Sequence, residues 1–352
     1  MVVVLGADVH KKSHTFEAAD GTGRRLGGIT VPATAAGHEQ ALRWAMDAFE
    51  GRERLWGLED CRNMTALLER DLLAAGERIV HVPTRLTAKV RASARTRGKS
   101  DPIDALAVAR AVLREPDLPE ANPEEASREL KLLVDRRDDL VAERTRAVNR
   151  LRWHLHELDP GREPTRAGIA RPPVRAALAQ WLEGIGGLVA ELAAEILADI
   201  DRQSTKIEAL TARITTTVQE QAPTLLEIRG CGPLSAAKIL GETAGIGRFR
   251  SEPCYAMFAG TAPIPVWSGN TAGRVRLNRG GNRQLNLALH RIAVTQTRLD
   301  GPGKHYYQRR RSTGDTPKEA LRCLKRQITK AVYHALKTHH TQTQNPPQPL
   351  AA

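Results

Sequence analysis

The sequence is poor in cysteine and in aromatic residues, and it contains no long uninterrupted hydrophobic run. Its cysteines, Cys61, Cys231, Cys254 and Cys323, form no Cys-x-x-Cys pair, which argues against a zinc finger or a disulfide scaffold and for a reducing compartment. No segment approaches the roughly 18 apolar residues of a membrane span. A signal peptide has a basic region before its apolar run, and the N-terminal apolar run of this sequence has none. We therefore expect a cytoplasmic protein without a membrane partner.

Positive charge is what the sequence has in excess. It contains 53 Lys and Arg residues against 40 Asp and Glu residues, so the formal net charge is +13 and the pI is about 10.0. This balance indicates a polyanionic partner. Because only 4% of the residues are aromatic, we expect contacts with backbone phosphates rather than base stacking. The length of 352 residues allows two or three domains.

Two acids, Asp101 and Asp104, open a predicted helix. Pro102 suits the first turn, Ser100 or Asp101 can cap it, and apolar residues follow at helical spacing. Because the acids are three residues apart, their side chains share one face of that turn. An acidic first turn can simply complement the helix dipole. The alternative is a cation site, since crowded carboxylates repel each other unless a cation or a proton lies between them.

Further acids follow predicted strands. The strand-like run 1–7 is followed by Asp8, and the run 54–58 is followed by Glu59. In an open α/β sheet, ligands collect at the carboxyl ends of the strands, so these acids and the acidic helix start can converge. Four carboxylates at one point require divalent metal, and two Mg²⁺ ions about 3.5–4 Å apart are the usual arrangement for phosphoryl transfer. The other predicted elements are strands at 13–19, 26–32 and 78–82 and helices at 34–49 and 64–76.

A basic run without acids precedes the acidic turn. Such a run is often only a solvated face, but beside a metal site it would hold phosphates. Its cations, which we interpret as nucleic-acid-binding, are Arg85, Lys89, Arg91, Arg95, Arg97 and Lys99.

Two long helical patterns occupy the middle of the chain. One runs over 124–158, and the other, over 188–221, keeps a near-heptad spacing. A continuous helix of that second length would span roughly 50 Å, which favours a coiled-coil hairpin. A pair of ordinary bundle helices within one chain is the alternative.

The last third contains a turn and a loop that suit phosphate contacts. Gly230 and Gly232 precede a helix in a pattern typical of a helix-hairpin-helix motif, although a plain inter-helix turn is the alternative. Ser268 lies in a Pro- and Gly-rich loop; on the residues alone, a loop serine is nearly always only solvent-exposed. The arginines that follow it, and that we interpret as phosphate-binding, are Arg274, Arg276, Arg279 and Arg283.

The motifs Gly6-Ala7-Asp8-Val9-His10-Lys11 and Lys99-Ser100-Asp101-Pro102-Ile103-Asp104-Ala105, with the strand ending at Glu59, resemble those of the DEDD transposases of insertion elements (insertion sequence 110 family). Asp60-Cys61-Arg62 depart from the small residues that follow the family's Glu, so Asp60 is an alternative to Glu59. The resemblance also covers Ala262-Pro263 and the basic segment after Ser268, where Asn278-Arg279 replace a family lysine.

The resemblance implies a RuvC-like (RNase H) catalytic domain with Asp8, Glu59, Asp101 and Asp104 as metal ligands. It implies that Ser268 is the nucleophile of a bridge-RNA-guided serine recombinase. Such an enzyme cuts and rejoins donor and target DNA through a covalent phosphoserine. The family also implies a homo-oligomer, a dimer that becomes a tetramer in the synaptic complex, in which one subunit supplies the metal cluster and another the serine.

The expected organisation has four parts. They are a catalytic domain at 1–115, a helical coiled-coil dimerisation region at 124–222, a mainly α C-terminal transposase domain at 223–338 and a disordered tail at 339–352. Two other functions stay open. One is a metal-dependent, junction-resolving endonuclease that hydrolyses DNA with water and does not use Ser268. The other is a basic scaffold that binds nucleic acid without chemistry.

Overall fold

The computed structural model describes residues 2–59, 64–92, 100–115, 117–121, 125–271, 275–278 and 280–344. The chain divides into two compact units. One contains residues 1–125, which we call the N-terminal part, together with residues 244–352, which we call the C-terminal part. The other, residues 126–243, is the helical unit. Within the described residues no helix is both long enough and apolar enough to cross a membrane.

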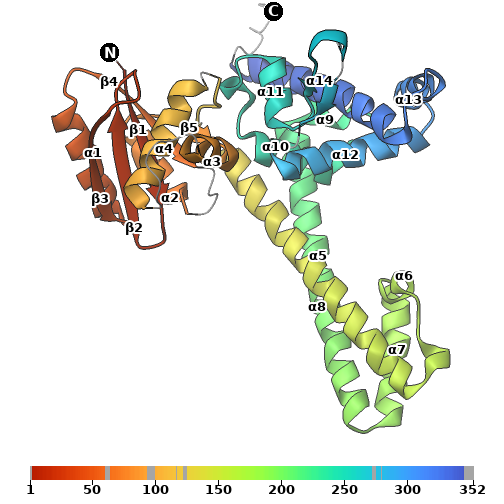
Figure 1. The fold of residues 1–352 in the computed structure, drawn as a ribbon. Coiled ribbons are helices and arrows are strands. Elements are labelled where there is room, and N and C mark those ends of the chain that lie inside the picture. Colours follow the sequence, from red (N-terminus) through yellow and green to blue (C-terminus); the bar gives the residue numbers. More distant parts are fainter. Residues whose placement is uncertain are drawn as a thin grey trace, which may run out of the picture. The chain divides into compact units, whose positions relative to one another are not determined.

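A five-stranded mixed sheet forms the centre of the N-terminal part (Figure 1). Its order is β3-β2-β1-β4-β5. Strand β1 pairs antiparallel with β2 and parallel with β4, β2 pairs antiparallel with β3, and β4 pairs parallel with β5. The strands, all of them predicted, are β1 (Val2–Val9), β2 (Ser13–Ala19), β3 (Arg25–Pro32), β4 (Glu53–Glu59) and β5 (Arg78–Val82).

Helices cover both faces of this sheet. Helices α1 (Ala35–Ala48) and α2 (Ala66–Ala74) pack on one face, where their buried side chains join a cluster around Phe16 and Trp56. Helices α3 (Thr84–Ala92) and α4 (Asp101–Arg114) pack on the other face. Together with the mainly helical remainder of the chain, this arrangement confirms the α/β class that was predicted for the N-terminal part.

Helix α4 lies unusually close to the sheet because two glycines face it. A Cβ on Gly6 would lie 2.1 Å from the carbonyl oxygen of Ala105, and a Cβ on Gly57 would lie 2.6 Å from the Val112 side chain. Gly6 and Gly57 are partners in the parallel register of β1 and β4. The two strands therefore offer a flat, side-chain-free surface on which the helix backbone rests.

The helical unit is built on two antiparallel helices of equal length. Helices α5 (Glu125–Leu158) and α8 (Leu188–Gln221) have the predicted bounds to within one residue. Between them lie η1 (Pro160–Arg162), α6 (Arg166–Ile169) and α7 (Pro172–Ile185). Gly186 and Gly187, with φ of 70° and 85°, form the turn between α7 and α8. Helices α9 (Pro223–Leu226) and α10 (Pro233–Thr243) follow, and α10 packs on α8. The unit therefore extends past the boundary predicted at residue 222.

The apolar stripe of α8 is buried within its own chain. Ile200 is 1% exposed and lies in one cluster with Leu151 and Leu155 of α5, and Ile207 is 5% exposed. The stripe therefore packs within one chain, against α5 and the helices around it. Dimerisation through this region stays a prediction.

Two arginines interrupt the apolar stripe of α5, and each binds a hydroxyl on α8. Arg137 Nε donates to Thr211 Oγ1 (2.8 Å), and Arg144 donates to Ser204 Oγ (3.2 Å). These bonds satisfy polar groups that the pairing of the two helices partly buries.

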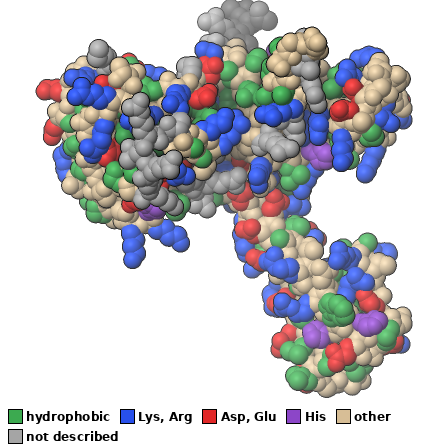
Figure 2. Space-filling model, viewed as in Figure 1, with side chains coloured by type: hydrophobic (Ala, Val, Ile, Leu, Met, Phe, Trp, Pro, Cys, Tyr) green, Lys and Arg blue, Asp and Glu red, His purple; other side chains and the backbone are tan. Residues whose placement is uncertain are grey.

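The C-terminal part is mainly helical, with one short hairpin. Its core lies between α12 and α14, where buried Leu289 and Ile292 belong to α12 and Leu324 and Ile328 belong to α14. Lys and Arg side chains gather over α13 (Figure 2, upper right). The elements are η2 (Ile246–Arg248), α11 (Glu252–Phe258), β6 (Pro263–Pro265), η3 (Gly269–Thr271), β7 (Val275–Leu277), α12 (Arg283–Arg298), α13 (Pro302–Ser312) and α14 (Pro317–Gln344).

The predicted tail and the predicted helix cap both need correction. Helix α14 continues through His339 to Gln344, so the chain is not disordered from residue 339. Residues 345–352 lie outside the described residues. Ser100 occupies the N-cap position of α4, but its side chain makes no capping hydrogen bond.

We expect Gly6→Ala to destabilise the protein, because the new methyl group must push the α4 backbone away from β1. Overpacking of this kind should lower the free energy of unfolding by roughly 2–4 kcal/mol. Gly21→Ala is the matched control, since a Cβ there meets no atom within 4 Å. Urea unfolding of both variants measures the difference; equal midpoints would show that the contact is not tight.

We expect Ile207→Asp to destabilise the helical unit rather than to dissociate an oligomer. A carboxylate placed among apolar side chains without a partner should cost about 3 kcal/mol or more. Ala209→Asp makes a comparable change on the exposed side of α8 and should have little effect. Circular dichroism measures the unfolding, and light scattering measures the mass. A fully folded Ile207→Asp variant of halved mass would instead show that the stripe forms an interface between subunits.

Candidate functional site

The sheet and α4 bring the predicted acids to one edge of the N-terminal part. Side chains alternate along a strand, so Asp8 lies on the same face of β1 as Gly6, the face that α4 covers. By the same rule Glu59 lies on the face of β4 that carries Gly57. Because Ala7 and Leu58 are register partners, Asp8 and Glu59 end neighbouring strands side by side.

The first turn of α4 brings two more carboxylates to this edge. The Nε2 atom of His10 lies 3.2 Å from Asp8 Oδ2 and 3.6 Å from Asp101 Oδ1. Ligand atoms of these three residues all lie within 4.8 Å of one another. Asp104 lies one helical turn further on, and its side chain is only 15% exposed.

The electrostatics show that these carboxylates act on one another. Burial raises the pKa of Asp8; the charges of Asp101 and Asp104 raise it further, and His10 lowers it. Burial also raises the pKa of Glu59, to which Asp8 and Asp104 add. The hydroxyl of Thr87 lowers the pKa of Glu59, although it lies outside strict hydrogen-bond geometry. Ionising the whole group therefore requires a compensating positive charge.

Helix α3 supplies one such charge. Arg91 donates a hydrogen bond to Asp104 Oδ1 at 2.6 Å, which raises the pKa of the arginine. Thr87, one turn earlier on the same face of α3, is buried near Glu59. This face of the helix therefore contacts the acids, and Arg91 binds a carboxylate. Its predicted role in binding nucleic acid stays a prediction.

The donor set fits a divalent metal. Hard oxygen ligands suit Mg²⁺ and Mn²⁺, and an imidazole is better tolerated by Mn²⁺ than by Mg²⁺. Asp8, Asp101 and His10 are close enough to share one ion. Burial, and to a smaller extent repulsion among the acids, raises the pKa values of Asp8 and Glu59, and a bound ion would oppose both effects.

Ser268 lies in the loop of the C-terminal hairpin. Strands β6 and β7 pair antiparallel, with Pro263 opposite Leu277 and Pro265 opposite Val275. The serine and its neighbour Trp267 are exposed, and Gly269 after them has φ of 48°. The glycine allows the sharp turn that directs the loop outward.

A cavity of about 680 Å³ adjoins this hairpin. Its lining combines Arg85 and Lys89 of α3 with Arg276 of β7 and Arg322 of α14, and no acid is among the described residues that line it. Arg85 and Lys89 are one helical turn apart, so they form a face of α3 separate from that of Thr87 and Arg91. This cationic cavity is suited to phosphate groups.

The remaining predicted residues are dispersed. Gly230 (φ 80°) and Gly232 lie in the turn before α10, in the helical unit. Arg283 begins α12 and lines a different cavity. The other predicted residues, which lie outside the described part of the chain, are Asp60, Arg95, Arg97, Lys99, Arg274 and Arg279.

Sequence reasoning missed two contributors to these sites, His10 and Arg322, and the partner of a third, Arg91. His10 stands two residues after Asp8, and that short spacing was the available signal for a shared ligand set. Arg91 was recognised as basic, but composition alone does not tell which face of α3 it occupies. Arg322 lies 46 residues after Arg276 in the sequence, and only the packing of α14 brings it to the hairpin.

Two models of one transposase family match different parts of the chain. The first, described as "Transposase", matches residues 5–160, and the second, described as "Transposase IS116/IS110/IS902 family", matches residues 222–308. The two matches together span most of the chain and include both the acidic edge and the Ser268 hairpin. The chain belongs to the IS116/IS110/IS902 transposase family. It is therefore a DNA transposase, an enzyme of DNA strand cleavage and transfer.

Curated relatives align with the transposase over nearly its full length. An insertion element IS116 protein of Streptomyces clavuligerus is 26% identical over 97% of this chain and 96% of its own. An insertion element IS900 protein of Mycobacterium paratuberculosis is 26% identical over 96% of both chains.

Among solved structures, T. thermophilus RuvC in complex with a Holliday junction substrate matches 33% of this chain and 96% of its own. The identity is 14% and the TM-score is 0.27.

We expect divalent metal to stabilise the transposase. Metal at about ten times its dissociation constant should add about 1.4 kcal/mol to the free energy of unfolding. Asp101→Asn and Asp104→Asn should lose this gain, whereas Asp47→Asn, on the exposed side of α1, should keep it. Thermal unfolding with and without MgCl₂ or MnCl₂ makes the comparison; equal gains in all four proteins would contradict the site.

The pH dependence of that gain follows from the raised pKa values of Asp8 and Glu59. Metal binds the ionised carboxylates, so its effect should fade as pH drops through these raised values. Without metal the sign reverses: the folded state holds the protons more tightly than the unfolded state, so stability should fall as pH rises through the same range.

Proposed function

We propose that this transposase cuts and rejoins donor and target DNA under the guidance of a bridge RNA. The observation that supports the proposal best is the convergence of Asp8, Glu59, Asp101 and Asp104 at one sheet edge. That convergence is the arrangement required for metal-assisted phosphoryl transfer.

The carboxylates and His10 have a clear task in this scheme. Asp8, Asp101 and Asp104 would hold Mg²⁺, and Glu59 would complete the set from β4. Bound metal supplies Lewis-acid polarisation of the scissile phosphate and stabilises charge on its oxygens. His10 orients Asp8 and Asp101, to both of which its imidazole is close.

Ser268 is the proposed nucleophile. Its Oγ forms a bond to phosphorus while the bond from phosphorus to a deoxyribose oxygen breaks. The serine proton passes to water, and the leaving oxygen takes up a proton. A DNA hydroxyl later reverses the exchange, so the number of phosphodiester bonds is conserved. Arg276 can stabilise charge on the phosphate from the same hairpin.

The remaining parts serve binding and assembly. Arg85, Lys89 and Arg322 contact backbone phosphates, while base pairing with the RNA reads the sequence. A homo-oligomer, a dimer or a synaptic tetramer, would place Ser268 of one subunit at the carboxylates of another. Trp153 and Leu188 are exposed on the helical unit, and a second copy would cover such apolar groups.

A junction-resolving endonuclease is the second candidate. The observation that favours it is the self-contained acidic edge, where His10 and the carboxylates gather without any residue of the Ser268 hairpin. In that enzyme water replaces the serine hydroxyl, and no protein–DNA bond forms.

We expect Ser268→Ala to bind DNA like the wild-type protein but to form no covalent adduct. Asp104→Asn should also bind DNA, and it should lose strand cleavage by at least about 10²-fold, because the phosphate is no longer activated. The assay combines radiolabelled DNA, Mg²⁺ and the RNA transcribed from the element's end, with denaturing electrophoresis to detect adducts. Thr297→Ala, a change at a hydroxyl on α12, is the control. Full recombination by Ser268→Ala would favour the endonuclease.

A further inference from the structure

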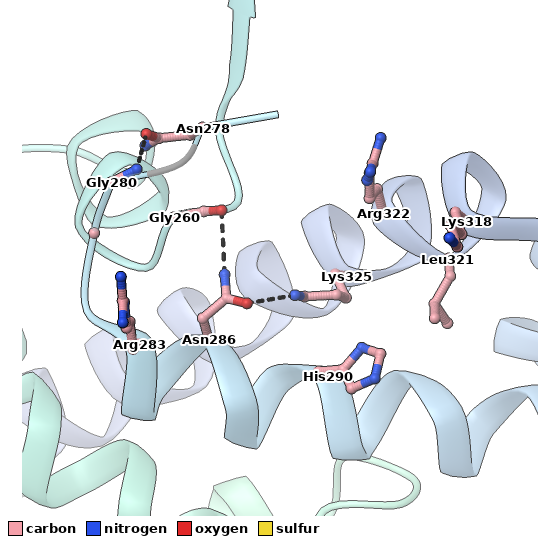
Figure 3. Close-up of a pocket in the computed structure, with 11 residues that line it drawn as sticks. Gly260, Asn278, Gly280, Arg283, Asn286, His290, Lys318, Leu321, Arg322 and Lys325 are labelled. Atoms are coloured by element: carbon pink, nitrogen blue, oxygen red, sulfur yellow. Dashed lines mark hydrogen bonds between the residues drawn. The ribbon is translucent and has the colours of Figure 1, made fainter. Parts of the chain in front are cut away.

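A second cavity, of about 520 Å³, lies entirely within the C-terminal part (Figure 3). It opens between the start of α12 and the facing side of α14, so we call it the α12–α14 cavity. Its remaining wall is backbone: Gly260, Gly280 and Gly281 line it beside the first turn of α12.

The wall is held by close backbone contacts. Gly281 has φ of 91°, and a Cβ on it would lie 2.5 Å from the backbone nitrogen of Gly260. The Asn282 N–H donates to the carbonyl of Phe258 at 2.6 Å. No side chain fits between these two segments, so this side of the cavity is preformed.

The lining is cationic. Arg283 and His290 come from α12, and Lys318, Arg322 and Lys325 come from α14. The described residues of the lining include neither Asp nor Glu. Within the described part of the chain none of these five groups forms an ion pair. Four formal positive charges around one cavity repel each other, and an anion is the group that would balance them.

The acid nearest to them along α14 is already engaged. Glu319 accepts hydrogen bonds from the backbone nitrogen of Thr316 at 2.9 Å and from its hydroxyl at 2.5 Å. It therefore caps the first turn of α14. The hydrogen bonds from Thr316, and to a smaller extent the charge of Arg322, lower the pKa of Glu319. The carboxylate is not among the described residues that line the cavity.

One cation is fixed toward the cavity by a chain of hydrogen bonds. The Asn286 amide nitrogen donates to the carbonyls of Ala259 (2.8 Å) and Gly260 (3.1 Å), which turns its oxygen toward α14. That oxygen accepts from Lys325 Nζ at 2.6 Å (Figure 3). An ammonium carries three N–H donors, so a ligand can accept the other two.

Burial has a measurable consequence for this lysine. Together with the charge of Arg322, it lowers the pKa of Lys325 to about 8. Burial and Lys325 in turn lower the pKa of His290. Burial is the main cause of both shifts and a neighbouring positive charge adds to it, so a bound anion would oppose both.

We infer that the α12–α14 cavity binds a phosphate group of a nucleic-acid strand, without reading the base. Guanidinium and ammonium groups are the side chains that bind phosphate. The cavity volume falls within the range of about 300–1,000 Å³ of small-molecule sites, so it admits a whole nucleotide. Its lining includes no Phe, Tyr or Trp, and so it offers bases no stacking platform. The binding of a phosphate is inferred from the cavity itself. The choice of nucleic acid as the source of that phosphate rests on the proposed function.

The test compares two charge-matched pairs of substitutions in the full chain. Arg283→Gln/Lys318→Gln removes two exposed cations that line this cavity and not the one beside the hairpin. Lys330→Gln/Lys337→Gln removes the same charge from α14 away from both cavities. Labelled single-stranded DNA of about 20 nucleotides, and RNA of the same sequence, are titrated by fluorescence anisotropy in EDTA over a range of salt concentrations.

The cavity pair should weaken binding of at least one strand about tenfold more than the control pair. It should also reduce the slope of log affinity against log salt by about 0.7 for each phosphate that the variant no longer binds. The strand whose affinity falls identifies the source as DNA, RNA or both. Equal decreases in affinity and equal slopes for the two pairs would overturn the inference.

Calorimetry with pyrophosphate alone separates a free phosphate ligand from a strand. Pyrophosphate binding that is abolished only in the cavity pair, with strand affinities unchanged, would overturn the assignment to nucleic acid. Because the titrations contain no metal, they do not depend on cleavage. A chain that binds strands through this cavity and yet never cleaves DNA with Mg²⁺ would contradict the proposed function alone.

Discussion

The close approach of α4 to the sheet is the constraint on which the acidic edge depends. Gly6 and Gly57 are register partners that present no side chain to the helix. Two residues further along each strand, on the same face, stand Asp8 and Glu59. A bulky residue at Gly6 would push the backbone of α4 at Ala105, next to Asp104, away from β1. The geometry of the carboxylates therefore follows from backbone packing, and the carboxylates themselves oppose it by their repulsion.

That repulsion explains why the acids are surrounded by cationic or polar groups. His10 contacts two of them, and Arg91 binds Asp104. Both groups partly relieve the raised pKa values of Asp8 and Glu59, but neither removes the shift. Without metal, the carboxylates are only partly neutralised by His10 and Arg91. A divalent ion would neutralise them more fully, so its binding should stabilise this edge strongly. Stability and metal affinity are thus linked through the same few side chains.

Much of the fold could be predicted because local signals agreed. The apolar run at 1–7 predicted the first strand, and the heptad spacing predicted the bounds of α8 to the residue. The partner of the α8 stripe could not be predicted, because an apolar seam does not tell whether its complement is α5 or another chain. Pairings between distant residues failed for the same reason: the sequence shows that residue 91 and residue 322 are basic, but tertiary packing decides which group each one meets.

Helix α3 shows how the transposase keeps opposite charges apart within a short distance. Thr87 and Arg91 face the carboxylates, while Arg85 and Lys89 line the cationic cavity beside the hairpin. The apolar Val90 packs in the core between these two faces. A nucleic-acid strand bound along the cationic face would come near the acids. The cations of that face would contact its phosphates and would not pair with the carboxylates. Helix α3 is therefore divided into a face that contacts the acids and a cationic face that lines the cavity beside the hairpin.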